Sequence, residues 1–188
     1  MKIRAVAIAV IVCATLTPTV RATARPDPKE MSLKVSDFPA GASVDYEHAD
    51  EKASLPGGLH GRLYATTYRF AVGRKTEVVN SIVIVAGSAR QARTIYGAAV
   101  RDNKAQNAPL QHQVLRVRRF GDEQYAVLLG DVAVEETQVQ LWVRHDAVVW
   151  MLYVNTDPTA ADSGLSKPRA LAELSKYGSK LQRRVGKG

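Results

Sequence analysis

The side chains most suited to chemistry are carboxylates, and the densest group lies early in the chain. Asp45, Glu47, His48, Asp50 and Glu51 fall within seven positions. A hard cation could bind Asp45 and Glu47, because residues two apart share one face of a strand. The group lacks the fixed ligand offsets and the central glycine of an EF-hand loop. We therefore expect a solvated strand edge here and no metal site.

Two further acidic pairs could perform acid–base catalysis. They are Asp122 with Glu123, and Glu135 with Glu136. An envelope hydrolase that uses carboxylates is the enzymatic alternative, and it would be favoured if two of these four side chains met a histidine in one cleft. Their positions at turns and strand edges favour solvation, and the chain lacks the G-x-S-x-G nucleophile elbow. The sequence thus favours a protein that is not an enzyme, and we assign no catalytic residue.

A basic run suggests an anion-binding patch. Alternation along a strand places Arg116 and Arg118 on one face, where a neighbouring strand could add Arg144. Nucleic-acid binding would call for aromatic stacking beside the arginines, and only Phe120 is adjacent. We therefore expect no nucleic acid as a partner, and solvated arginines remain the alternative to an anion patch.

The larger aromatic side chains could line an apolar pocket between a sheet and a helix. These residues are Tyr64, Tyr68, Trp142, Trp150 and Tyr153, and core packing is the alternative for them. Phosphate-loop and dinucleotide fingerprints are absent, so we expect no cofactor. The resulting hypothesis is a binding domain for a small apolar or amphiphilic ligand or a cell-envelope component. A scaffold or inhibitor that binds a protein partner through an exposed sheet face is a further alternative.

The first 24 residues have the three parts of a signal peptide. Lys2 and Arg4 precede an apolar run over 5–16, and the small-x-small triplet 22–24 follows. The run is well short of the roughly 20 residues that cross a membrane. We expect cleavage after Ala24 and a secreted or extracytoplasmic protein with no membrane-spanning segment, an uncleaved anchor being the alternative. Cleavage would remove Cys13, the one cysteine, and lower the net charge from +8 to +5.

The rest of the chain predicts one α+β domain. Over all 188 residues, 46% are hydrophobic and 23% are charged, which fits a soluble globular protein. We expect a flexible lead-in over 25–32 and a single domain over 33–185, with a polar loop over 50–58. Apolar alternation predicts strands, and 3.6-residue periodicity predicts helices. The expected strands are 42–48, 60–72, 78–85, 114–118, 124–129, 133–144 and 147–155, and the expected helices are 89–104 and 168–184.

This order, βββαββββα, favours an antiparallel β-sheet with two helices packed on one face. The pattern also resembles known exported proteins, through the segments 33–41, 88–104, 120–123 and 143–149. It resembles secreted actinobacterial proteins of unknown function, the extracellular sensor domain of PknH-type kinases and, more loosely, Mog1/PsbP-like lipoproteins. The resemblance spans about 33–184 and implies an exported antiparallel sheet backed by helices. Its motifs are turn-forming residues, so it implies no ligand and no catalytic residue.

Overall fold

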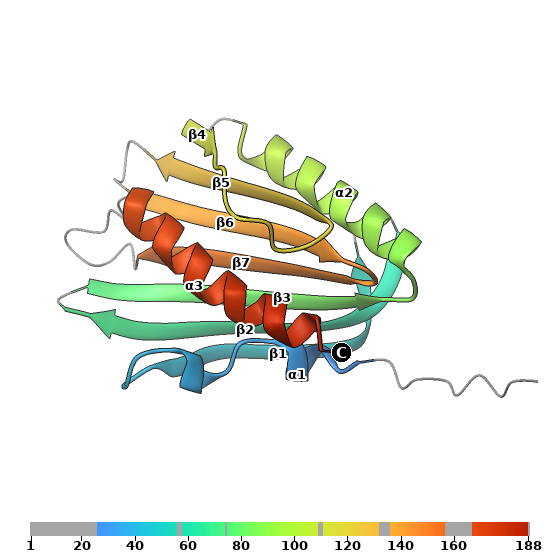
Figure 1. Cartoon of the computed structure of the whole chain (residues 1–188), viewed down its shortest axis with the longest axis horizontal. Coiled ribbons are helices and arrows are strands. Elements are labelled where there is room, and N and C mark those ends of the chain that lie inside the picture. Colours follow the sequence, from blue (N-terminus) through green and yellow to red (C-terminus); the bar gives the residue numbers. More distant parts are fainter. Residues whose placement is uncertain are drawn as a thin grey trace, which may run out of the picture.

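The computed structural model describes residues 26–55, 58–73, 75–108, 111–131, 136–156 and 167–187. These residues form one seven-stranded sheet with helices against it (Figure 1). The strands are β1 (Ser43–Leu55), β2 (Leu59–Val72), β3 (Lys75–Ala86), β4 (Gln111–Val114), β5 (Glu123–Asp131), β6 (Glu136–His145) and β7 (Val148–Thr156). The helices are α1 (Pro28–Met31), the 3-10 helix η1 (Val35–Asp37), α2 (Ala89–Gln106) and α3 (Lys167–Val185).

Every strand pairs antiparallel with its neighbours, in the order β1-β2-β3-β7-β6-β5-β4. The sheet thus consists of two runs of hairpin-linked strands that meet where β3 pairs with β7. Val83 lies opposite Trp150, which in turn lies opposite Val143 on β6. The α+β class with an antiparallel sheet is therefore confirmed.

The two long helices lie close to their expected positions. Ser88 begins α2, because its Oγ accepts a hydrogen bond from the backbone N–H of Gln91 at 3.2 Å. The buried stripe Ala92, Ile95 and Ala99 then faces the sheet. Among the described residues, no helix is both long and apolar enough to span a membrane.

The helices pack on opposite faces of the sheet, so the expectation that both lie on one face is wrong. Alternate residues of a strand point to opposite sides. On β7, Trp150 and Leu152 pack in the cluster that contains α3, whereas Val149 and Met151 pack in the cluster that contains α2. The central strands are apolar on both sides, so both faces need cover. In Figure 1, α3 crosses in front of the strands.

We call the α3 side the closed face, since several elements cover it. The residues from α3 are Ala170, Leu174, Tyr177, Leu181 and Val185, and Met31, Leu33, Phe38 and Phe120 add to the same cluster. The expected flexible lead-in instead contains α1, which Asp27 caps through the backbone N–H of Lys29 at 2.9 Å. Met31 is buried. The sequence did not predict this burial, because the apolar side chains of residues 25–32 have no regular spacing.

Two strands, β1 and β4, differ most from expectation at their ends. β1 continues to Leu55, so the loop expected from residue 50 is wrong. As an edge strand exposed on both sides, it carries polar side chains without alternation and is held by its pairing with β2. β4 ends at Val114, where a strand over 114–118 was expected. Of the strand expected over 133–144, residues 133–135 lie outside the described residues.

Candidate functional site

We call the α2 side the half-open face, because α2 covers part of it and leaves a hollow over the remaining strands. This sheet hollow has a volume of about 280 Å³. Its lining residues come from β1, β2, β3, β6 and β7. They are Tyr46, Ala65, Thr66, Thr67, Asn80, Ile82, Gln138 and Tyr153.

Carboxamides fix the polar part of the sheet hollow. The hydroxyl of Thr67 donates to Asn80 Oδ1 at 2.6 Å. From the α2 side, Asn103 Nδ2 donates to Gln140 Oε1 and Gln140 Nε2 donates to Gln138 Oε1, each at 2.6 Å. Since both Asn80 and Gln138 accept through their oxygens, and their amino groups have no partner among the described residues, those amino groups can donate beside the hollow.

Two tyrosines supply the aromatic part. The Tyr46 side chain is 54% exposed, which is unusual for a ring of this size. Tyr153 packs edge-on against Trp142, with ring centroids 5.8 Å apart, and its hydroxyl donates to Met151 Sδ at 3.7 Å. Burial raises the pKa of Tyr153 above its ordinary value. The hollow therefore presents neutral rings and amide donors side by side, which suits an amphiphilic molecule.

The five aromatic residues considered for ligand binding divide between the two faces. Tyr64, Tyr68 and Trp150 are buried and share the closed face. There Tyr68 donates its hydroxyl to the carbonyl of Leu33, and burial raises its pKa to about 12. Trp142 and Tyr153 lie on the half-open face, and Tyr153 alone of the five lines the sheet hollow.

Sequence reasoning missed the partners of Tyr153. Tyr46, Asn80, Ile82 and Gln138 come from three different strands, β1, β3 and β6. Strand register brings them together, with Asn80 opposite both Thr67 and Tyr153. A tyrosine among the charged side chains of residues 45–51 was the one sequence signal that could have pointed here.

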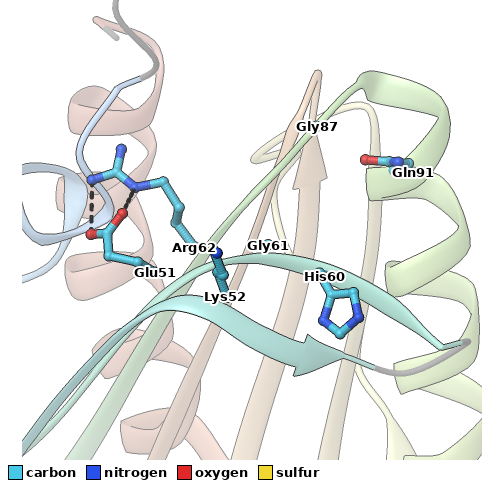
Figure 2. Close-up of a pocket in the computed structure, with 7 residues that line it drawn as sticks. All are labelled: Glu51, Lys52, His60, Gly61, Arg62, Gly87 and Gln91. Atoms are coloured by element: carbon cyan, nitrogen blue, oxygen red, sulfur yellow. Dashed lines mark hydrogen bonds and ion pairs between the residues drawn. The ribbon is translucent and has the colours of Figure 1, made fainter.

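A second and larger hollow, the end basin, lies where β1 and β2 approach the start of α2. Its volume is about 560 Å³, and it is lined by Glu51, Lys52, His60, Gly61, Arg62, Gly87 and Gln91. Figure 2 shows Glu51 and Arg62 facing each other on one side and His60 and Gln91 on the other.

A β-bulge shapes the end basin. Glu51 and Lys52 together lie opposite Arg62 alone, which turns Glu51 onto the guanidinium at 2.6 and 3.1 Å. Gly61 allows the backbones to approach, since a Cβ there would lie 2.9 Å from the carbonyl oxygen of Val85. The charges of this basin are thus largely paired within the protein.

The three arginines of the expected anion patch are not brought together. Arg144 is 5% exposed and contacts Asp122 Oδ2 at 3.1 Å and Glu123 Oε1 at 3.0 Å. Arg116 and Arg118 lie in the segment after β4 and line a separate groove beside α3. The reason is that the chain leaves the sheet after Val114, so these two arginines share no strand face with Arg144.

One of the four carboxylates considered for catalysis, Asp122, lies near a histidine. Asp122 Oδ1 lies 3.9 Å from His145 Nδ1, and Glu123 shares Arg144 with Asp122. The N–H of Asp146 donates to Asp122 and, with Arg144, lowers the pKa of that carboxyl. The ion pairs and hydrogen bond of Asp122 stabilise the turn. An ionised carboxylate is a poor general acid because it has no proton to donate. Glu135 and the side chain of Glu136 lie outside the described residues.

The early acidic cluster is dispersed into ion pairs. Asp45 contacts Arg69 at 2.5 Å, and Glu47 contacts Lys29 at 2.8 Å. With Glu51 bound to Arg62, three of its four carboxylates already have cationic partners. In the described part of the chain, no three acidic, histidine or cysteine side chains are grouped to hold a metal ion.

Comparison with known proteins identifies the fold. No family model and no curated protein matches the sequence. Among solved structures, an uncharacterized protein of Mycobacterium smegmatis (Rv0999 ortholog) is 13% identical with a TM-score of 0.38, over 84% of each chain. The extracellular domain of PknH from Mycobacterium tuberculosis is 10% identical with a TM-score of 0.59, and the match covers 85% of this chain and 95% of that chain. This chain therefore shares the fold of the PknH extracellular domain, as the sequence resemblance implied.

Proposed function

We propose that the protein is an exported, non-enzymatic binding domain that holds a small amphiphilic ligand in the sheet hollow. The observation that carries this proposal is the pairing, in one open hollow, of two tyrosine rings with two carboxamide donors. Apolar walls with a few fixed polar groups are the usual composition of a small-molecule site.

The size and polarity of the sheet hollow restrict the ligand. A volume of about 280 Å³ lies just below the roughly 300–1,000 Å³ typical of sites for drug-sized molecules. The ligand would place a ring or short apolar chain against Ile82 and the tyrosines. Its carbonyl, ether or hydroxyl oxygens would accept from Asn80 and Gln138, whose positions the hydrogen-bonded amides fix in advance.

Neutral amphiphile binding tests the proposal. We expect Tyr46→Ala to raise the Kd of the fluorescent probe N-phenyl-1-naphthylamine about tenfold, through loss of about 1.4 kcal/mol of ring contact. Tyr46→Phe, which keeps the ring, should bind as the wild type does. Val35→Ala is the matched control, since Val35 is an exposed apolar residue on η1, outside the sheet hollow. Equal affinity in Tyr46→Ala and Val35→Ala would exclude the sheet hollow as the site.

Export rests on the first 24 residues. Their basic start, apolar run and small-x-small triplet have the form of a signal peptide. The shared fold with a domain described as extracellular supports the same compartment. N-terminal sequencing of protein recovered from the host's envelope or medium should begin at Arg25, and a sequence that begins at Met1 would contradict cleavage. Native mass spectrometry of the same sample should show any ligand that stays bound.

A further inference from the structure

A third hollow, the arginine groove, lies on the closed-face side, between the segment 115–120 and α3. It has a volume of about 190 Å³ and is lined by Arg116, Val117, Arg118, Phe120, Leu171 and Ser175. In Figure 1 the yellow segment after β4 passes on the same side of the sheet as α3. The arginine groove is therefore separated from the sheet hollow by the sheet itself.

One side chain holds the arginine-bearing segment in place. Gln124 accepts from the backbone N–H of Phe120 at 2.8 Å and donates to the carbonyls of Val117 and Arg118 at 3.3 and 3.2 Å. Phe120 is 1% exposed and packs directly on α3, where a Cβ on Gly178 would lie 3.0 Å from its ring. The backbone under the two guanidinium groups is thus fixed without any ligand.

The charges of the groove are not balanced within the described residues. Arg118 donates to Ser179 Oγ and lies 4.9 Å from the centroid of the Phe120 ring, so its contacts leave the positive charge without an acidic partner. The exposed Arg116 has no ion pair or hydrogen bond with any described residue. Glu173, the nearest acid along α3, pairs with Lys176 at 3.5 Å. By contrast, Arg144 and Arg184 each contact carboxylates.

We propose that the arginine groove binds the phosphate group of a phosphorylated ligand. Planar guanidinium groups match phosphate oxygens by paired hydrogen bonds, and a serine hydroxyl adds a neutral donor. Ser175 supplies that hydroxyl from α3, while Val117 and Leu171 provide an apolar wall for the carbon atoms next to the phosphate. The site differs in place and chemistry from the sheet hollow and does not depend on ligand binding there.

Titration with inorganic phosphate, followed by amide NMR shifts at constant ionic strength, tests the site. We expect saturable shifts confined to 115–120 and to the part of α3 around Ser175. The double variant Arg116→Gln with Arg118→Gln should raise the Kd at least about tenfold, since both charge-assisted contacts are lost. Lysine at both positions should raise the Kd about threefold to fivefold, because lysine keeps the positive charge but lacks the planar guanidinium group that pairs with two phosphate oxygens.

The matched control is Arg101→Gln, which removes an exposed arginine of α2 from the other side of the sheet and should change the Kd less than about twofold. If this control and the double variant raised the Kd for phosphate equally, the effect would be one of net charge, and the proposed site would be wrong. Absence of saturation, or wild-type affinity in the double variant, would overturn it as well.

A phosphate group can belong to a soluble ester or to a lipid headgroup. Vesicles of phosphatidylglycerol and phosphatidylcholine distinguish them. If the protein binds these vesicles and inorganic phosphate displaces it, the lipid is the source. Phosphate binding without vesicle binding indicates a soluble ester, and failure in both assays excludes the proposal.

Discussion

The two faces of the sheet are built from the same strands, both carry apolar clusters, and they differ in how completely they are covered. On β3, Val79 and Val83 point to the closed face and are fully buried, whereas Asn80 and Ile82 point to the half-open face and line the sheet hollow. The closed face is covered by α3, the N-terminal segment and residues 115–120 together. The half-open face has α2 as its helical cover. Stability is thus concentrated on one side, which leaves the other side room for a ligand.

Trp150→Ala should give the largest effect on stability. Its side chain is fully buried on the closed face and packs edge-on against Phe120, with ring centroids 6.0 Å apart. Truncation should lower the free energy of unfolding by about 3–5 kcal/mol through lost contacts and a cavity. Urea unfolding measures this loss, and a loss under about 1 kcal/mol would contradict the view that the closed face holds the fold.

Gly121→Ala should destabilise the same face by a smaller amount. An alanine Cβ would lie 2.5 Å from the carbonyl oxygen of Arg144 and 2.6 Å from Val143 Cγ1, and a backbone atom cannot easily move away. We expect a loss of about 1–3 kcal/mol in the free energy of unfolding, measured by thermal or urea unfolding. Gly130→Ala is the control, since no atom lies within 4 Å of its added Cβ. Equal losses at the two glycines would contradict the steric argument.

Glu77 is the exception on the closed face, a fully buried carboxylate that contacts Arg169. Burial raises its pKa above 4.5, and the charge of Arg169 offsets this in part. Between pH 4.5 and the raised pKa, Glu77 is therefore more protonated in the folded state than in the unfolded state. Its contribution to the free energy of unfolding consequently falls as the pH rises through this range. Glu77→Gln should remove that fall, as seen in urea midpoints from pH 4.5 to 7. Unchanged pH dependence would show that the carboxylate is not desolvated.

Tyr46→Ala should give the smallest effect on stability, within about 0.5 kcal/mol, because the ring is exposed on the half-open face. Urea unfolding of this variant beside Trp150→Ala compares the two faces directly. A loss of more than about 2 kcal/mol would mean that Tyr46 supports the fold, and its role in the sheet hollow would then be in doubt.

The order of the elements could be predicted from the sequence because strand alternation and helical periodicity are local signals. The helix after Ser88 and the hairpin of β6 and β7 are examples. The placement of α2 and α3 on opposite faces could not be predicted, since a strand that is apolar on both sides gives no preference for either. The sheet hollow was missed for a related reason. Its residues meet through the register of β3 with β2 and β7, which no single segment encodes.

The arginine residues show the same limit. Arg116 and Arg118 alternate as they would on a strand, and their alternation predicted a shared face with Arg144. The carboxamide of Gln124 instead holds the backbone carbonyls of Val117 and Arg118, which takes this segment off the sheet. Hydrogen bonds from one side chain to backbone groups four or more residues away can thus prevent a strand that the local alternation predicts.

The long edge strand β1 has a consequence for how the molecule behaves among its own copies. An uncovered strand of 13 residues offers its backbone as a template for association and fibril growth. In β1 the irregularities between Val44 and Tyr46 and between Asp50 and Ala53 break the regular pairing into short stretches, of which 46–50 is the longest. Charged side chains at Asp45, Glu47 and Glu51 add a hydrated barrier along the same border. Both features oppose edge-to-edge pairing between the sheets of two copies.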